Sequence, residues 1–104
     1  MNNNINIAVV GLGQIGNYLV NELNKKKWDI EIKTGKKIKL IAISAKNINK
    51  KRKFKINKKI FYKNPLNIFK IKKVDILFEC IGLSDGISKK VVESALKNKI
   101  HVIT

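Results

Sequence analysis

The chain has 104 residues, a formal charge of +16 and a hydrophobic content of 44%. This length suffices for one domain that buries roughly two-thirds of its unfolded surface. No apolar run approaches the roughly 18 residues of a membrane span, so neither a membrane helix nor a signal peptide is expected. A positive charge of this size is compatible with a nucleic-acid partner. Lys, Ile and Asn, whose codons are rich in A and T, make up about half of the sequence, so base composition is the alternative explanation of the charge.

Cys80 is the only cysteine, which excludes a disulfide framework and a zinc site built on cysteines. This usage fits a reducing compartment, and we expect a cytoplasmic protein. Cys80 lies in an apolar run without a basic neighbour, so we expect an unreactive core thiol.

The most informative segment joins a predicted strand, Ile5 to Val10, to the pattern Gly-x-Gly-x-x-Gly. In this pattern Gly11 makes the tight turn, Gly13 lets a pyrophosphate approach the backbone, and Gly16 lets the next helix pack closely. Unpaired N–H groups of that helix, which we expect from Gln14, then face the phosphates. The pattern therefore predicts a dinucleotide site; the alternative is a glycine-rich strand-to-helix turn without a ligand.

The predicted helix has apolar residues at helical spacing, Ile15, Leu19 and Leu23. Residues 24–37 either prolong it or form a bulge that ends at Gly35. The apolar run 38–43 predicts a second strand, as in a parallel sheet covered on both faces.

The next part of the chain is predicted in shorter pieces. Residues 46–59 carry eight Lys or Arg residues and predict a mobile surface loop. A short third strand over 60–62 follows, and Pro65 then opens a brief helical or irregular segment.

The last third of the chain predicts a buried strand, a helix and another strand. The buried strand covers 74–81, and the helix runs from a cap at Ser84 or Asp85 to Lys97. Residues 100–103 form the final strand. Strands alternating with helices predict an α/β fold, a doubly wound parallel sheet of the Rossmann type with about five strands.

The end of the second strand is where a Rossmann domain reads the adenosine ribose. Ser44, Ala45 and Lys46 occupy it, and no acidic residue occurs between Glu31 and Asp75. Ser44 suits either a ribose hydroxyl or a phosphate oxygen, and the loop cations Lys50, Lys51 and Arg52 are within reach. This pattern favours NADP over NAD, although base composition alone also supplies lysines here.

Three further residues have a functional and a structural interpretation. Gly82 ends the fourth strand where the nicotinamide half would lie, but a strand-to-helix turn capped by Asp85 explains the same residues. Glu79 lies in an apolar strand and needs a partner, as a structural carboxylate would. His101 stands alone and is expected to be a solvated or capping side chain.

These segments together resemble the amino-terminal NAD(P)-binding domain of homoserine dehydrogenase. Four blocks, covering almost the whole chain, carry the resemblance: 10–16, 34–38, 75–82 and 95–104. It implies NAD(P)-dependent hydride transfer between homoserine and aspartate 4-semialdehyde, in the route to threonine and methionine. Leu83 departs from the family, which often has a second glycine there.

The resemblance also implies site residues. The pyrophosphate would contact Gly11, Leu12, Gly13, Gln14, Ile15 and Gly16. The adenosine ribose would contact Ser44, Ala45 and Lys46, and the nicotinamide side would contact Gly82 and Thr104. The family's catalytic Lys and Asp, its homoserine site and its dimerisation region belong to a later domain. Residues 1–104 are therefore expected to form the cofactor domain alone, a fragment that binds without catalysis, from a parent that is a homo-oligomer.

Two other functions stay open. A regulatory Rossmann module, like the ligand-sensing domains of potassium transport systems, usually carries an acidic residue after the second strand, and this chain does not. A basic nucleic-acid-binding protein would explain the charge, but the cations are scattered and no nucleic-acid motif occurs. We expect a dinucleotide partner, no specific nucleic acid and no membrane.

Overall fold

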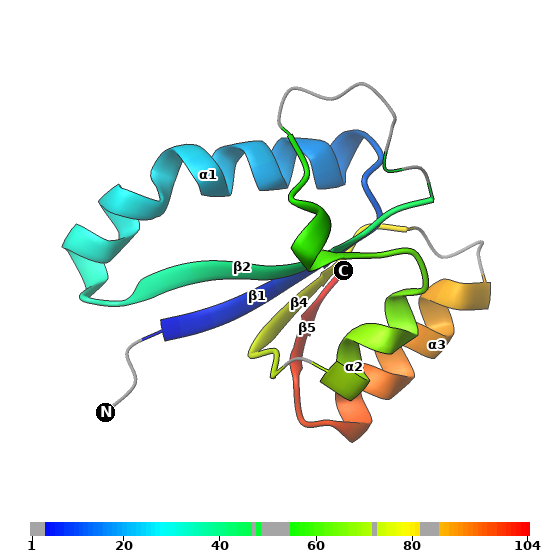
Figure 1. The fold of residues 1–104 in the computed structure, drawn as a ribbon. Coiled ribbons are helices and arrows are strands. Elements are labelled where there is room, and N and C mark those ends of the chain that lie inside the picture. Colours follow the sequence, from blue (N-terminus) through cyan, green and yellow to red (C-terminus); the bar gives the residue numbers. More distant parts are fainter. Residues whose placement is uncertain (1–3, 47, 49–54, 72, 82–85) are drawn as a thin grey trace.

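The computed structural model describes residues 4–46, 48, 55–71, 73–81 and 86–104. Within them a parallel sheet of five strands has the order β3-β2-β1-β4-β5, with β1 at its centre (Figure 1). The strands are β1 (Asn4–Val10), β2 (Lys37–Ser44), β3 (Phe61–Tyr62), β4 (Ile76–Glu79) and β5 (His101–Ile103). This order is that of the Rossmann fold, and it confirms the predicted class.

Helical segments connect the strands and cover both faces of the sheet (Figure 1). They are α1 (Gln14–Thr34), η1 (Lys58–Ile60), η2 (Pro65–Asn67), α2 (Ile68–Ile71) and α3 (Gly86–Lys97). Helix α1 lies on one face, and α2 and α3 lie on the other. Because every connection returns to the same end, the carboxyl ends of all the strands form one edge.

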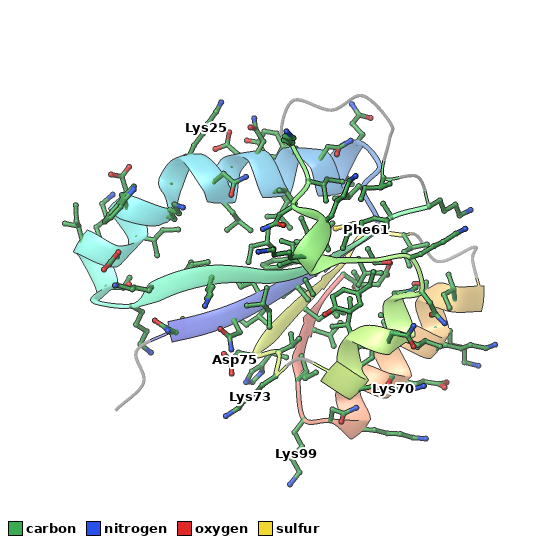
Figure 2. All side chains as sticks on the ribbon, in the orientation of Figure 1. Lys25, Phe61, Lys70, Lys73, Asp75 and Lys99 are labelled. Atoms are coloured by element: carbon green, nitrogen blue, oxygen red, sulfur yellow. The ribbon has the colours of Figure 1, made fainter. Side chains whose placement is uncertain are left out.

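The centre of the sheet is buried on both faces, which explains the apolar strands. Ile7 and Val9 of β1 pack with Val20 of α1, whereas Ala8 and Val10 point into the cluster formed by α2 and α3. At the opposite edge from the strands' carboxyl ends, the backbone N–H of Asn6 donates to Oδ2 of Asp75 at 2.7 Å. Figure 2 labels Asp75 there.

Helix α1 decides between the two alternatives that the sequence left open for residues 24–37, and it confirms Gly35 as the residue that ends the helix. It continues to Thr34, so residues 24–34 prolong the helix and form no bulge. Gly35 ends it with φ 72°, and its N–H donates to the Glu31 carbonyl at 2.8 Å. The buried side of the helix holds Gly16 and Val20, whereas Ile15, although it fits the apolar spacing, is 74% exposed.

Two strands are shorter than predicted. The run 74–81 forms a strand only over Ile76–Glu79, and Ile60 belongs to η1 rather than to β3. Apolar character extends beyond the paired backbone because flanking residues such as Val74 also enter the core. Ser84, Asp85 and half of the predicted loop 46–59 (residues 47 and 49–54) lie outside the described residues.

No helix in the described part of the chain is long and apolar enough to cross a membrane.

Candidate dinucleotide site

A cavity of about 740 Å³ opens at the carboxyl edge of the sheet, where β1, β2 and β4 end. This volume falls within the range of roughly 300–1,000 Å³ typical of small-molecule and cofactor sites. The lining residues come from the ends of four strands and the connections that follow them: Val10, Gly11, Leu12, Gly13, Ser44, Ala45, Lys46, Lys63, Asn64, Pro65, Cys80, Ile81 and Ile87. The fold thus brings together the turn after β1 and the segments that follow β2, β3 and β4.

The turn after β1 requires glycine at its first position. Gly11 has φ 93°, a conformation that L side chains rarely adopt. A Cβ on Gly11 would lie 2.8 Å from the backbone nitrogen of Ile81. The Gly11 N–H donates to the Ser44 carbonyl at 2.8 Å, which ties this turn to the end of β2.

The other two glycines have opposite surroundings. A Cβ on Gly16 would overlap the carbonyl oxygen of Gly11, so Gly16 is what lets α1 start directly against the turn. A Cβ on Gly13 would meet nothing within 4 Å. Two glycines are therefore required by the protein itself, whereas the space beside Gly13 is open.

Helix α1 begins beside this open space without a side-chain cap. Gly13 is the N-cap residue, and its carbonyl accepts the Asn17 N–H at 2.9 Å. No acidic residue lies in the first turn, where Gln14 and Ile15 are exposed. Uncapped N–H groups and the positive end of the helix dipole attract an anion at this point.

Asn17 presents an unusual atom one turn into α1. Its side-chain oxygen Oδ1 is buried, and within the described residues it has no hydrogen-bond partner. Sequence analysis did not identify this residue, because an asparagine in a helix carries no signal of its own.

The end of β2 contributes a buried hydroxyl and an exposed cation. Ser44 is 3% exposed, Ala45 is 9% exposed, and Lys46 is exposed at the cavity. A second ammonium group, that of Lys63 after β3, lines the same cavity. Sequence analysis missed Lys63, although its place directly after a strand was a usable signal, because the carboxyl ends of parallel strands share an edge.

The end of β4 closes the other side of the cavity. Glu79 is 5% exposed, and its Oε2 accepts the Ile81 N–H at 2.5 Å, which supplies the partner that its burial requires. Cys80 and Ile81 line the cavity. Burial, and secondly the charge of Glu79, raise the pKa of the Cys80 thiol. This shift fits an unreactive thiol.

The remaining predicted residues do not line the cavity. Gln14, Ile15 and Gly16 form the start of α1 instead, and Thr104 is exposed after β5. Gly82 lies outside the described residues. His101 is exposed, as expected for a solvated side chain. Within the described ranges no group of three His, Cys, Asp or Glu residues is arranged to hold a metal ion.

Comparison with known proteins identifies the family. Residues 11–104 match the family model described as homoserine dehydrogenase, NAD binding domain. The chain belongs to this family. It is 29% identical over 100 residues to homoserine dehydrogenase of Neisseria gonorrhoeae, a match that covers 96% of this chain and 22% of that protein.

Solved structures of homoserine dehydrogenases share the fold. The Staphylococcus aureus enzyme at pH 8.5 has a TM-score of 0.87 and 29% identity, covering all of this chain and 26% of its own. The Thiobacillus denitrificans enzyme has a TM-score of 0.74, 21% identity and coverages of 95% and 22%, a likeness of fold alone. The chain thus spans about a quarter of the length of these relatives.

Proposed function

We propose that this chain holds NAD(P) for a homoserine dehydrogenase, with the pyrophosphate at the turn after β1. The observation that carries the proposal is the open space at Gly13, between the uncapped start of α1 and the cavity. A turn with a purely structural role has no need for glycine at that position, because a side chain would meet no neighbour there. The bound cofactor would supply the hydride donor or acceptor.

The rest of the cofactor would follow the carboxyl edge of the sheet. The adenosine ribose would lie at Ser44, Ala45 and Lys46, and the nicotinamide side at Gly82 and Thr104. Backbone N–H groups from Leu12 to Gly16, together with the dipole of α1, would bind the pyrophosphate. The apolar side chains in the lining, Leu12, Pro65, Ile81 and Ile87, would exclude water around the uncharged parts of the cofactor.

We propose that the site favours NADP over NAD. Lys46 and Lys63 both line the cavity, and among the described residues that line it none is a carboxylate. The two ammonium groups would therefore attract the 2′-phosphate of NADP. The ribose hydroxyl of NAD would lack the acidic acceptor that is found in sites specific for NAD.

We also propose that the complete enzyme interconverts homoserine and aspartate 4-semialdehyde as a cytoplasmic homo-oligomer. The catalytic Lys and Asp, the homoserine site and the dimerisation region would come from residues outside 1–104, since this chain matches only about a quarter of its relatives. The role of residues 1–104 would be to bind and orient the cofactor.

No specific nucleic-acid partner is part of this proposal. Figure 2 shows the labelled lysines Lys25, Lys70, Lys73 and Lys99 projecting from separate parts of the molecule. A charge distributed in this way predicts weak binding of nucleic acid that falls steeply with salt.

Calorimetry with NADPH and NADH, beside an assay of homoserine oxidation, tests the proposal. We expect the 104-residue chain to bind both dinucleotides, NADPH more tightly, without oxidising homoserine. Failure of both to bind to folded protein would overturn the cofactor role. Homoserine oxidation by the purified chain would overturn the proposal that the catalytic residues lie outside residues 1–104.

A further inference from the structure

A second hollow, which we call the β2 groove, lies on the α1 face of the sheet. Its volume is about 280 Å³, and it runs between α1, β2 and the segment around η1. Its apolar lining consists of Val20, Leu23, Ile38, Leu40, Ile43 and Ile60. It shares no lining residue with the dinucleotide cavity.

The groove follows from the way this face of the sheet is covered. Helix α1 packs over β1 and the near side of β2, and within the described residues the crossover from β2 to β3 contains only the single turn η1. Val20 and Ile43 at the bottom are 1% and 2% exposed. Leu23, Ile38, Leu40 and Ile60 remain half-buried, so apolar surface stays open beside β2.

Among the described residues that line the β2 groove, the ionisable ones are all cations. Lys27 comes from α1, Lys39 from β2 and Lys55 from the segment before η1, and all three are exposed. The ion pairs of the described residues use other lysines, Lys26 with Glu22 at 3.2 Å and Lys37 with Glu31 at 3.9 Å. Asn24 and Asn57 complete the polar rim.

We propose that the β2 groove binds a small carboxylate with an apolar body, the body lying on the floor and the carboxylate among Lys27, Lys39 and Lys55. The volume is about twice that of a 150 Å³ cavity that holds benzene, so a ring with a short chain fits. Three ammonium groups attract a net anion and repel the ammonium of a zwitterionic amino acid. A neutral molecule of the same shape gains only the apolar contact.

This inference stands apart from the proposed function, because the two sites share no lining residue. The probe is 3-phenylpropanoate, titrated into isotopically labelled protein and followed by amide chemical shifts. The matched controls are 3-phenylpropan-1-ol, which lacks the charge, and 3-phenylpropylamine, which reverses it. We expect the amide shifts of Val20, Leu23 and Ile38 to change on binding, with affinity decreasing from the carboxylate to the alcohol to the amine. The carboxylate should bind roughly fivefold more tightly than the alcohol. The presence of NADPH should change these affinities little.

Charge variants decide whether the groove lysines hold the carboxylate. Lys27→Gln and Lys39→Gln should each weaken 3-phenylpropanoate about two- to fivefold, the range of an exposed ion pair. Lys97→Gln on α3 makes the same change in net charge away from the groove and should leave the affinity unchanged. Equal affinity for acid and alcohol, equal losses in all three variants, or shifts outside the groove would overturn the proposal. Amide chemical shifts of groove residues that change with protein concentration in the absence of probe would indicate that the groove contacts a second copy of the chain. This result would also overturn the proposal.

Discussion

The turn after β1 and the segment after β2 line the same cavity but are held in place by different means. The turn is fixed by backbone sterics, since Gly11 and Gly16 each lie against main-chain atoms. The end of β2 and the residues after it present side chains to the cavity, a buried Ser44 and an exposed Lys46. The two are joined by the hydrogen bond from Gly11 to the Ser44 carbonyl.

The comparison separates two kinds of information in a binding site. A main-chain conformation that only glycine allows limits the sequence to one residue type, and the pattern is therefore readable. An exposed cation is compatible with many environments, and in a chain of net charge +16 its presence carries little information. We therefore expect substitutions in the turn to have larger effects than substitutions after β2.

The largest effect should come from Gly16→Ala. The new Cβ would overlap the Gly11 carbonyl, and neither the turn nor α1 can move without disturbing the other. We expect a loss of roughly 3 kcal/mol or more in the free energy of unfolding, measured by urea denaturation. Gly13→Ala is the matched control and should stay within about 1 kcal/mol of the parent, because its Cβ enters open space. Similar unfolding of the two variants would contradict the steric difference between these glycines.

Gly13→Val should remove dinucleotide binding while the fold persists. The branched side chain would occupy the space that we assign to the pyrophosphate, and the affinity for NADPH should fall by about a hundredfold, roughly 2.7 kcal/mol. Calorimetry gives the affinity, and circular dichroism gives the helix content. If a folded Gly13→Val protein binds as tightly as the parent, the open space at Gly13 has no role in binding.

A smaller and more selective effect is expected for Lys46→Ala. Loss of a charge-assisted contact with the 2′-phosphate should reduce the preference for NADPH over NADH by about 1–2 kcal/mol. Lys63→Ala, which removes the other ammonium group that lines the cavity, should act in the same direction. Lys73→Ala at the far edge of the sheet is the control for net charge (Figure 2). Equal losses for both cofactors would disprove recognition of the phosphate by Lys46.

The smallest effect concerns the pH dependence of stability. Burial and the charge of Glu79 raise the pKa of the folded Cys80 thiol above its unfolded value of 9.0, so the protonated thiol favours the folded state. This contribution is fully present below pH 9 and is lost as the pH rises through the folded pKa. The urea midpoint of the parent should therefore fall more between pH 8 and pH 10 than that of Cys80→Ser. Parallel falls in the two proteins would show that Cys80 does not contribute.

Local patterns predicted the elements well, and their limits show where packing acts. Helix α1 begins at Gln14 as predicted, but the spacing of Ile15, Leu19 and Leu23 did not reveal that Ile15 is 74% exposed. The cavity was predicted at the ends of β1, β2 and β4. Lys63 was missed although the third strand was predicted, because the residues after that short strand were not included in the expected site.

The sequence by itself determined the order of elements, the parallel sheet and the glycine turn, because hydrophobic periodicity and the steric demands of glycine act over a few neighbouring residues. The pattern also assigned the tight turn to Gly11 and close helix packing to Gly16, but only the tertiary structure supplied the backbone atoms that enforce these roles. It also decided that Lys46 and Lys63 share one cavity while Lys27, Lys39 and Lys55 surround another. Which side chains share a cavity depends on contacts between segments that are far apart in the chain. A local pattern of residues does not encode those contacts.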